Sequence, residues 1–224
     1  RCFDAAKKTV CIDHHVSNQG FADISQIEPE ASSTCEVLYK TMDADRISRS
    51  VAECIYTGII HDTGVFKYSC TSKTTMAVAG EMMEKGIDYT DIIDNSFYAK
   101  TYVQNQILGR ALLESVVFYD GKCIFSVVTQ REMEFYGVTG RELGGIVEQL
   151  RLTDGVEVAI FMYEVGEDEY KVSMRSKKQI DVAAIASEFG GGGHVRAAGY
   201  TAKGTVHQII NCIGELIEKQ YNAM

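Results

Sequence analysis

The spacing of hydrophobic residues predicts a mainly helical first half of this 224-residue chain and a strand-rich second half. A short apolar run over 9–12 is typical of a strand that ends at a polar cluster. Ser33 and Glu36 stand three residues apart, the spacing of a capping box that opens a helix over 31–44. Similar apolar spacing predicts further helices over 48–60, 72–85, 89–99 and 103–115.

Strand patterns replace helical ones near residue 116, where we expect a second domain to begin. The runs 115–119 and 122–129 flank Asp120-Gly121, a pair that favours a two-residue hairpin turn. Further strands are expected over 156–163 and 170–176, and helices over 181–189 and 205–221. Helices and strands together predict an α/β protein, with 1–100 and 116–224 as its domains and a linker helix over 101–115.

Composition narrows the class of protein. A hydrophobic content of 46% is ample for the cores of two modest domains. We find no apolar stretch long enough for a membrane span and no signal-peptide pattern, and the seven cysteines show no CxxC spacing. These features predict a cytoplasmic protein with reduced thiols. The net charge of −9 argues against tracking along duplex DNA, so any nucleic-acid substrate should be short.

Candidate chemistry begins where the first predicted strand ends, at Asp13, His14 and His15. Asp62 also follows an apolar element and offers a hard oxygen ligand to an ion whose nitrogen ligand is His14. Mixed imidazole and carboxylate ligation suits manganese, zinc or iron, or magnesium with more oxygens. An ordinary surface loop is the alternative for the triplet alone, and a structural zinc site with Cys11 is less favoured because no second half-site is present.

A run of four glycines, 190–193, predicts a second site. Glycines without Cβ atoms allow the backbone to approach a ligand, and their amides can bind an anion. A simple turn after a helix needs only one glycine. The following His194 and Arg196 therefore favour a phosphate or carboxylate site.

The alternation of polar and apolar residues along the predicted strand 170–176 places a basic residue, Arg175, on its polar face. Lys171, Ser173 and Arg175 share the polar face of that strand, which is suited to line a cleft. The planar guanidinium of Arg175 matches phosphate oxygens, although an isolated arginine is more often a solvated surface charge. His61 is interpreted as a structural or supporting residue and His207 as a solvated helix residue.

In the order and spacing of these motifs, the chain resembles the DHH/DHHA1 phosphoesterases over nearly its whole length. The segments that carry the resemblance are Ile12-Asp13-His14-His15 with Asn18, Ala31 to Glu36, Gly58 to Gly64 with Phe66, Met174-Arg175-Ser176, Asp181, and Gly190 to Gly199. The resemblance implies the C-terminal part of a parallel-sheet DHH domain, a linker helix and a smaller α/β DHHA1 domain with a mixed sheet.

The resemblance also implies roles for individual residues in a phosphodiesterase that uses two metal ions, usually Mn²⁺, with Mg²⁺ as an alternative. His14 and Asp62 would ligate metal, His15 would contact the scissile phosphate, and Asp13 would orient the pair. The substrate would be held by Arg175, Ser176, Gly191, Gly192, Gly193, His194 and Arg196.

Two family motifs have no counterpart in this sequence: a His-x-x-x-Asp-x-Asp run and a later aspartate that bridges both metals. We expect them to lie before Arg1, and we expect the 224-residue chain by itself to be inactive and at best a weak metal binder. The layout is most similar to the nanoRNase/pAp phosphatase group, whose substrates are short oligoribonucleotides and 3'-phosphoadenosine 5'-phosphate. The alternatives are a phosphodiesterase of cyclic or linear dinucleotides and a non-catalytic nucleotide-binding module. A homodimer is also conceivable from the sequence.

Overall fold

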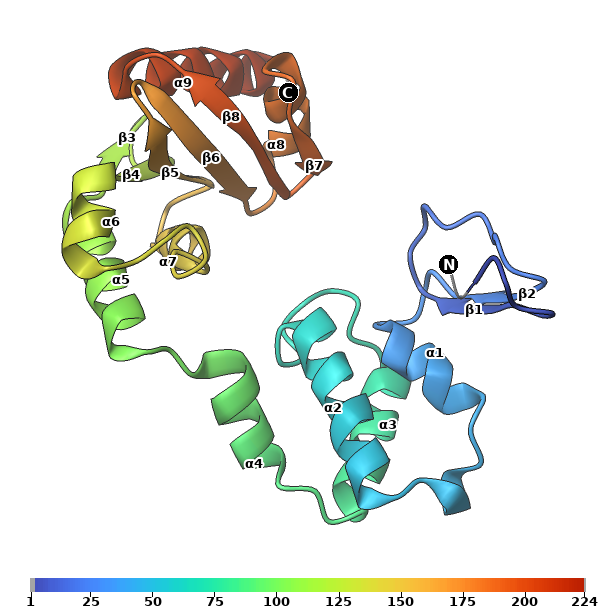
Figure 1. The fold of residues 1–224 in the computed structure, drawn as a ribbon. Helices are drawn as coiled ribbons and strands as arrows, with labels where there is room; N and C mark the ends of the chain where they lie inside the picture. Colours follow the sequence, from blue (N-terminus) through green and yellow to red (C-terminus); the bar gives the residue numbers. More distant parts are fainter. Residues whose placement is uncertain (1–2, 224) are drawn as a thin grey trace. The chain divides into compact units, whose positions relative to one another are not determined.

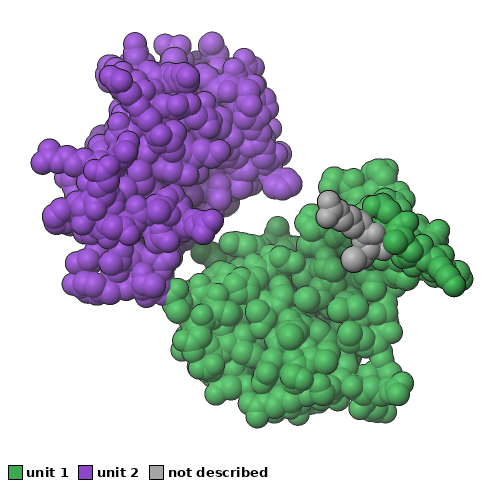
Figure 2. Space-filling view, in the orientation of Figure 1, with its two compact units in different colours: residues 1–99 green, residues 100–224 purple. Residues whose placement is uncertain are grey.

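The chain folds into two compact units, residues 1–99 and 100–224, in a computed structural model that describes residues 3–223 (Figures 1 and 2). Each unit has its own hydrophobic core, and both combine helices with a sheet. The predicted α/β class is confirmed. Within the described residues no helix is long and apolar enough to cross a membrane.

The first unit consists of a small parallel sheet followed by helices. Its strands, β1 (Val10–Asp13) and β2 (Ile24–Ile27), pair in parallel. The elements that follow are α1 (Thr34–Lys40), a short 3-10 turn (Ala44–Arg46), α2 (Arg49–Thr63), α3 (Lys73–Glu84), α4 (Tyr89–Ile92) and the π-helix η2 (Ile93–Tyr98). The core of the unit lies mainly between α2 and α3.

The predicted capping box at the start of α1 is only half correct. Ser33 is the N-cap, and its hydroxyl accepts a hydrogen bond from the Glu36 amide. The Glu36 carboxylate, however, accepts from the Ser32 hydroxyl at 2.6 Å and from the Thr75 hydroxyl of α3 at 2.8 Å. A side chain predicted to serve its own helix therefore ties α1 to α3 inside the core.

Close contact between α1 and α2 depends on a glycine. A Cβ added at Gly58 of α2 would lie only 2.2 Å from the Cys35 Sγ of α1. The same helix continues three residues beyond the predicted 48–60, to Thr63, and its C-cap Gly64 adopts a left-handed conformation with φ 57°. These two glycines fix where α2 packs and where it stops.

The second unit is a six-stranded mixed sheet. Its order is β3-β4-β5-β6-β8-β7, with β4 and β5 parallel and the other neighbours antiparallel. The strands are β3 (Val116–Phe118), β4 (Cys123–Val128), β5 (Val158–Gly166), β6 (Glu169–Ser176), β7 (Gly192–His194) and β8 (Ala197–Lys203). Asp120 and Gly121, both with positive φ, occupy the centre of the β3–β4 turn as predicted.

Helices cover both faces of this sheet (Figure 1). On one face, α5 (Tyr102–Leu113) and α7 (Ile146–Arg151) contribute buried residues, and α6 (Gln130–Tyr136) packs partly buried residues against them. The other buries residues of α8 (Val182–Glu188) and α9 (Val206–Asn222). The segment 101–115, predicted as a linker helix, thus forms α5 and places Ile107 and Ala111 in the core of the second unit.

Several elements have no counterpart among the sequence predictions: β2, α6, α7, β7 and β8. The two helices are only seven and six residues long, too short to display a helical period clearly. Strand β7 consists of two glycines and a histidine, residue types that rarely indicate a strand. Pairing with β8, rather than local propensity, creates it.

Candidate metal and phosphate sites

The Asp13 carboxylate organises the polar cluster at the end of β1. Its Oδ2 accepts from the Asn18 amide at 2.6 Å, and its Oδ1 accepts from the backbone N–H groups of His14 and His15 at 2.8 and 3.3 Å. The Thr34 hydroxyl at the start of α1 donates to the same Oδ1 at 3.3 Å. These contacts hold the carboxylate in place against His14, His15 and Asn18.

His15 forms an ion pair with this carboxylate. The His15 Nδ1 lies 2.7 Å from Asp13 Oδ1, while the rest of the ring is exposed. The Asn18 amide, followed by His15, holds the pKa of the Asp13 carboxyl well below its usual value. In turn, the hydrogen bond to Asp13 raises the pKa of His15. When it is protonated, this solvent-facing imidazole is suited to contact an anionic phosphate.

His14 points toward Asp62 from a different element. Its Nδ1 lies 3.2 Å from the Ala31 carbonyl oxygen, which can only accept, so Nδ1 carries the proton. The Nε2 of the same ring faces Asp62 Oδ2 of α2 at 3.6 Å. Two segments distant in sequence, the end of β1 and the last turn of α2, therefore bring together the two residues predicted to bind metal.

This pair has the chemistry of part of a metal site. An imidazole nitrogen and a carboxylate oxygen suit Mn²⁺, and their separation is compatible with two ligands of one ion, whose bonds are about 2.0–2.2 Å long. The Ala31 carbonyl fixes the tautomer as outer partners of metal-bound histidines commonly do. Within residues 3–223, however, no group of three or more His, Cys, Asp or Glu side chains is arranged to hold an ion.

The glycine run of the second unit forms a hairpin edge rather than a loop alone. Gly190 ends α8 with φ 73°, and residues 192–194 form β7. A Cβ at Gly191 would lie 2.4 Å from the Gly199 carbonyl oxygen and from Tyr200 Cβ, and one at Gly193 would lie 2.4 Å from the Ala197 carbonyl oxygen. Gly192 faces open space. Packing thus requires glycine at 191 and 193, whereas a Cβ at Gly190 or Gly192 would meet nothing within 4 Å; of these two, Gly192 lies in β7.

The sheet register places two predicted residues on one face. Arg175 of β6 pairs with Ala197 of β8, which pairs with His194 of β7. Directly paired residues project to the same side of a sheet, so Arg175 and His194 flank the small side chain of Ala197. The next row on that face is Ser173, Gly199 and Gly192. A floor of alanine and glycine lies between a guanidinium and an imidazole, an arrangement suited to an anion.

Arg175 already has one partner. Its Nε donates to Glu148 Oε1 of α7 at 2.5 Å, while its Nη1 donates to the Met174 carbonyl. The guanidinium is therefore held in place and partly neutralised. An incoming phosphate would have to share it with Glu148.

The other two predicted residues serve the hairpin turn. Ser176 is buried on the opposite face, and its hydroxyl donates to the Ile180 carbonyl at 2.6 Å. Arg196 Nη1 donates to the same carbonyl at 2.8 Å. Both side chains fix the turn that carries His194, which is a positioning arrangement rather than direct contact with a ligand.

Sequence reasoning missed three residues of these sites. Glu148 lies on α7, which was not predicted, although Ile146, Val147 and Leu150 have helical spacing that could have revealed it. Ser173 was placed on the polar face but not assigned to the site. Thr34, which supports Asp13, gives no signal in the sequence because its partner is distant along the chain.

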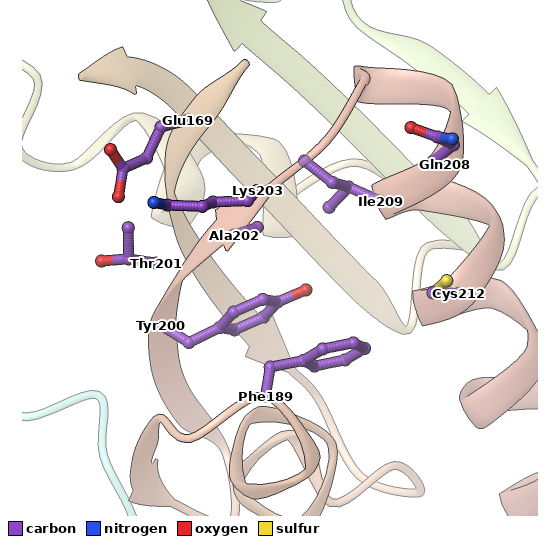
Figure 3. A pocket seen from close by; sticks show the side chains of 9 residues that line it. All are labelled: Glu169, Phe189, Tyr200, Thr201, Ala202, Lys203, Gln208, Ile209 and Cys212. Atoms are coloured by element: carbon purple, nitrogen blue, oxygen red, sulfur yellow. The ribbon is translucent and has the colours of Figure 1, made fainter. Parts of the chain in front are cut away.

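A further hollow lies along β8, and two of its lining residues, Phe189 and Tyr200, directly flank the segment 190–199. Its volume is about 410 Å³, and Figure 3 shows Phe189 and Tyr200 on its wall, with the rings stacked at a centroid distance of 4.6 Å. Four consecutive residues, 200–203, line it. Because consecutive strand residues face opposite sides, the hollow follows the edge of β8 beyond the point where β7 ends.

Comparisons with known proteins connect both sites to one family. The profile of the DHH family N-terminal domain matches residues 1–59, and that of the DHHA1 domain matches residues 120–219. The chain is 30% identical to a bifunctional oligoribonuclease and PAP phosphatase, NrnA, of Thermus thermophilus, covering 86% of this chain and 58% of that protein. It is 27% identical to the cyclic-di-AMP phosphodiesterase PdeA of Listeria monocytogenes, covering 87% of this chain and 30% of that protein.

A solved structure shows the same arrangement of elements. An exopolyphosphatase-related protein from Bacteroides fragilis superposes with a TM-score of 0.86 at 28% identity, covering 95% of this chain and 64% of that one. The chain thus spans less than two thirds of the length of each of these three proteins.

Proposed function

Because this chain belongs to the DHH/DHHA1 family, we propose that it is part of a metal-dependent phosphoesterase acting on short oligoribonucleotides or on 3'-phosphoadenosine 5'-phosphate. The observation that carries the proposal is the meeting of His14 Nε2 with Asp62 Oδ2 at 3.6 Å. The Thermus relative, named for both activities, supports the choice of substrates.

In this proposal the first unit holds the reacting phosphate. His14 and Asp62 would hold a divalent cation, Mn²⁺ by preference, which when bound would supply Lewis-acid chemistry to activate water and to offset the charge that develops on the phosphate. Asp13 orients the His15 ring and raises its pKa, and a protonated His15 would donate to a non-bridging oxygen of the phosphate. The Ala31 carbonyl accepts from the Nδ1 of His14, which leaves Nε2 as the nitrogen that would bind the metal.

The second unit holds a further phosphate of the substrate. Arg175 and His194 donate to its oxygens over the floor of Ala197, and the Gly192 backbone lies open beside them. A site of this size suits a terminal phosphate. It agrees with short substrates and with the acidic composition of the chain.

Two ligands do not complete the coordination shell of an ion. We therefore propose that the 224-residue chain binds Mn²⁺ weakly and needs further ligands to form a dinuclear centre. Robust manganese-dependent hydrolysis by this chain would contradict that proposal. The same observation supports a second candidate, a non-catalytic nucleotide-binding module.

A third candidate is a phosphodiesterase of cyclic or linear dinucleotides, supported by the similarity to the Listeria enzyme. Binding titrations separate the candidates. We expect the chain to bind a trinucleotide and 3'-phosphoadenosine 5'-phosphate, and preferential binding of cyclic di-AMP would favour the third candidate. Binding of none of the three ligands would refute a role in nucleotide chemistry.

The metal site is tested by equilibrium dialysis with Mn²⁺ alone. His14→Ala and Asp62→Asn should each reduce the affinity at least about tenfold, because each removes one of two direct ligands. His207→Ala is the matched control, since His207 is an exposed residue of α9 that bonds only to Asn211 among the contacts described. Equal affinities in all four proteins would exclude the site.

A further inference from the structure

A series of three aromatic rings begins beside the candidate metal ligand Asp62. His61 and Phe97 meet at a ring-centroid distance of 5.5 Å, and Phe97 and Tyr98 meet at 5.1 Å with their planes at 88°. All three residues belong to the first unit. The series leads from the last turn of α2 to the end of η2.

The first ring of the series is held by a hydrogen-bond chain. The Ser96 hydroxyl donates its proton to the Ile92 carbonyl at 2.6 Å, so it can only accept from the His61 Nε2 at 3.2 Å. His61 Nε2 therefore carries a proton. This contact fixes the orientation of the His61 imidazole, the first ring of the series, against Phe97.

Core packing anchors only the start of the π-helix that carries the other two rings, where the partly buried Ile93 packs against the core of the first unit. None of the residues of η2 is fully buried, although π-helical geometry is rare and costs hydrogen-bond quality. Single π-helical turns occur frequently at functional sites. Here the distortion places Phe97 against His61 and leaves Tyr98 outside.

Tyr98 ends the series with a ring face in solvent. Its exposed fraction is 58%, and an edge-to-face contact with Phe97 occupies at most one of its two faces. An exposed aromatic face on a fixed support is the feature on which single-stranded nucleic acids stack their bases.

We propose that Tyr98, supported by Phe97 and His61, is a stacking site for a nucleobase of the substrate next to the candidate metal site. The inference rests on the proposed function and adds the part of the substrate that the metal and phosphate sites leave unassigned. Stacking tolerates any base, since each has a π face. It also requires no positive surface, which suits a chain with a net charge of −9.

The test compares two ligands on the 224-residue chain by calorimetric titration: an adenylate trinucleotide and its abasic analogue, which keeps the sugars and phosphates. Tyr98→Ala should weaken binding of the trinucleotide about 5- to 150-fold, which corresponds to 1–3 kcal/mol for one stacked base. Binding of the abasic analogue should not change. Tyr98→Phe should restore the affinity, because the ring and not the hydroxyl stacks.

Tyr89→Ala is the matched control, since Tyr89 is also an exposed tyrosine of the first unit, at 43%, but makes no ring contact in the series. It should leave both affinities unchanged. Upfield shifts of the adenine protons in NMR spectra, lost in Tyr98→Ala, would identify stacking directly.

The two possible failures are distinguishable. If wild-type chain binds the trinucleotide and Tyr98→Ala binds it equally well, the stacking site is refuted while the proposed function stands. If Tyr98→Ala loses affinity equally for the abasic analogue, the stacking site is also refuted, because Tyr98 would then contact a part of the ligand other than the base. If wild-type chain binds neither ligand, the proposed function itself fails, and the stacking site with it.

Discussion

Alanine substitutions at Gly191 and Gly192 should separate the packing role of the glycine run from its ligand role. At Gly191 the new Cβ would lie 2.4 Å from both the Gly199 carbonyl oxygen and Tyr200 Cβ, and 3.0 Å from Tyr200 Cα. These atoms belong to the backbone and to the root of a buried side chain of β8, so they cannot move aside cheaply. At Gly192 no atom lies within 4 Å of the new Cβ.

The expected difference follows from these contacts. Both substitutions restrict the unfolded chain equally and by themselves would stabilise the protein by about 0.4–1 kcal/mol. This contribution cancels in the comparison. The overpacking cost at Gly191, about 1–3 kcal/mol, remains, so Gly191→Ala should be less stable than Gly192→Ala by about that amount.

Native-state hydrogen exchange measures this difference within the second unit. The amides of β6 and β8 should exchange about 5- to 150-fold faster in Gly191→Ala than in Gly192→Ala, if they exchange through global opening of the unit. Gly192→Ala should keep wild-type protection and still weaken binding of 3'-phosphoadenosine 5'-phosphate, because Gly192 lies beside the anion floor. Equal protection in the two variants would refute the steric reasoning, and unchanged binding would refute the ligand role of Gly192.

Three further predictions concern stability. Gly58→Ala should destabilise the first unit by about 1–3 kcal/mol in urea titrations, because the new Cβ would meet Cys35 Sγ at 2.2 Å. The control Gly80→Ala in α3, whose new Cβ meets nothing within 4 Å, should stabilise the unit by about 0.5–1 kcal/mol. The opposite order would contradict this account of α1–α2 packing. Tyr200→Phe should raise the free energy of unfolding by about 1 kcal/mol in thermal denaturation, since the Tyr200 hydroxyl is buried without a hydrogen-bond partner among the described residues. A lower free energy of unfolding would show that the hydroxyl has a hydrogen-bond partner. Burial alone would raise the pKa of Glu36, but hydrogen bonds from hydroxyl and backbone groups and the ion pair with a lysine lower it from 4.5. The ionised carboxylate therefore stabilises the fold above pH 4.5, and this stabilisation is lost as the pH falls through the folded-state pKa. The difference in unfolding free energy between wild type and Glu36→Gln should shrink below pH 4.5, and a constant difference from pH 7 to pH 3 would contradict the assignment.

The position of helices and strands with strong periodicity could be predicted from the sequence alone. Helices α2 and α9 begin within one residue of the predicted starts, and the structure makes Ser48 and Thr205 their N-caps, residues that act within a few positions of themselves. The Asp120-Gly121 turn was predicted for the same reason, as positive φ is a local requirement. Short elements such as α7 and β7 were missed because their stability comes from partners distant in the chain.

The candidate sites divide in a similar way. Residue types and spacing pointed to the candidate site residues, because the residue type fixes which chemical groups a side chain carries. These residues are Asp13, His14, His15, Asp62 and the glycine run. Their partners were not predictable: the Ala31 carbonyl that fixes the His14 tautomer and the Glu148 carboxylate that shares Arg175 are both brought in by folding.

The sequence by itself determined which side chains are available for metal and phosphate chemistry and which segments become helices. Only the tertiary structure decided how they are used. The fold brings His14 within 3.6 Å of Asp62, and it leaves no room for a Cβ at 191 and 193 while Gly192 stays open. It also directs the Glu36 carboxylate, predicted to cap its own helix, to hydrogen bonds with Ser32 and with Thr75 of α3. The physical reason is that propensity and capping act over a few residues, whereas steric exclusion, burial and the pairing of charges depend on which distant segments meet.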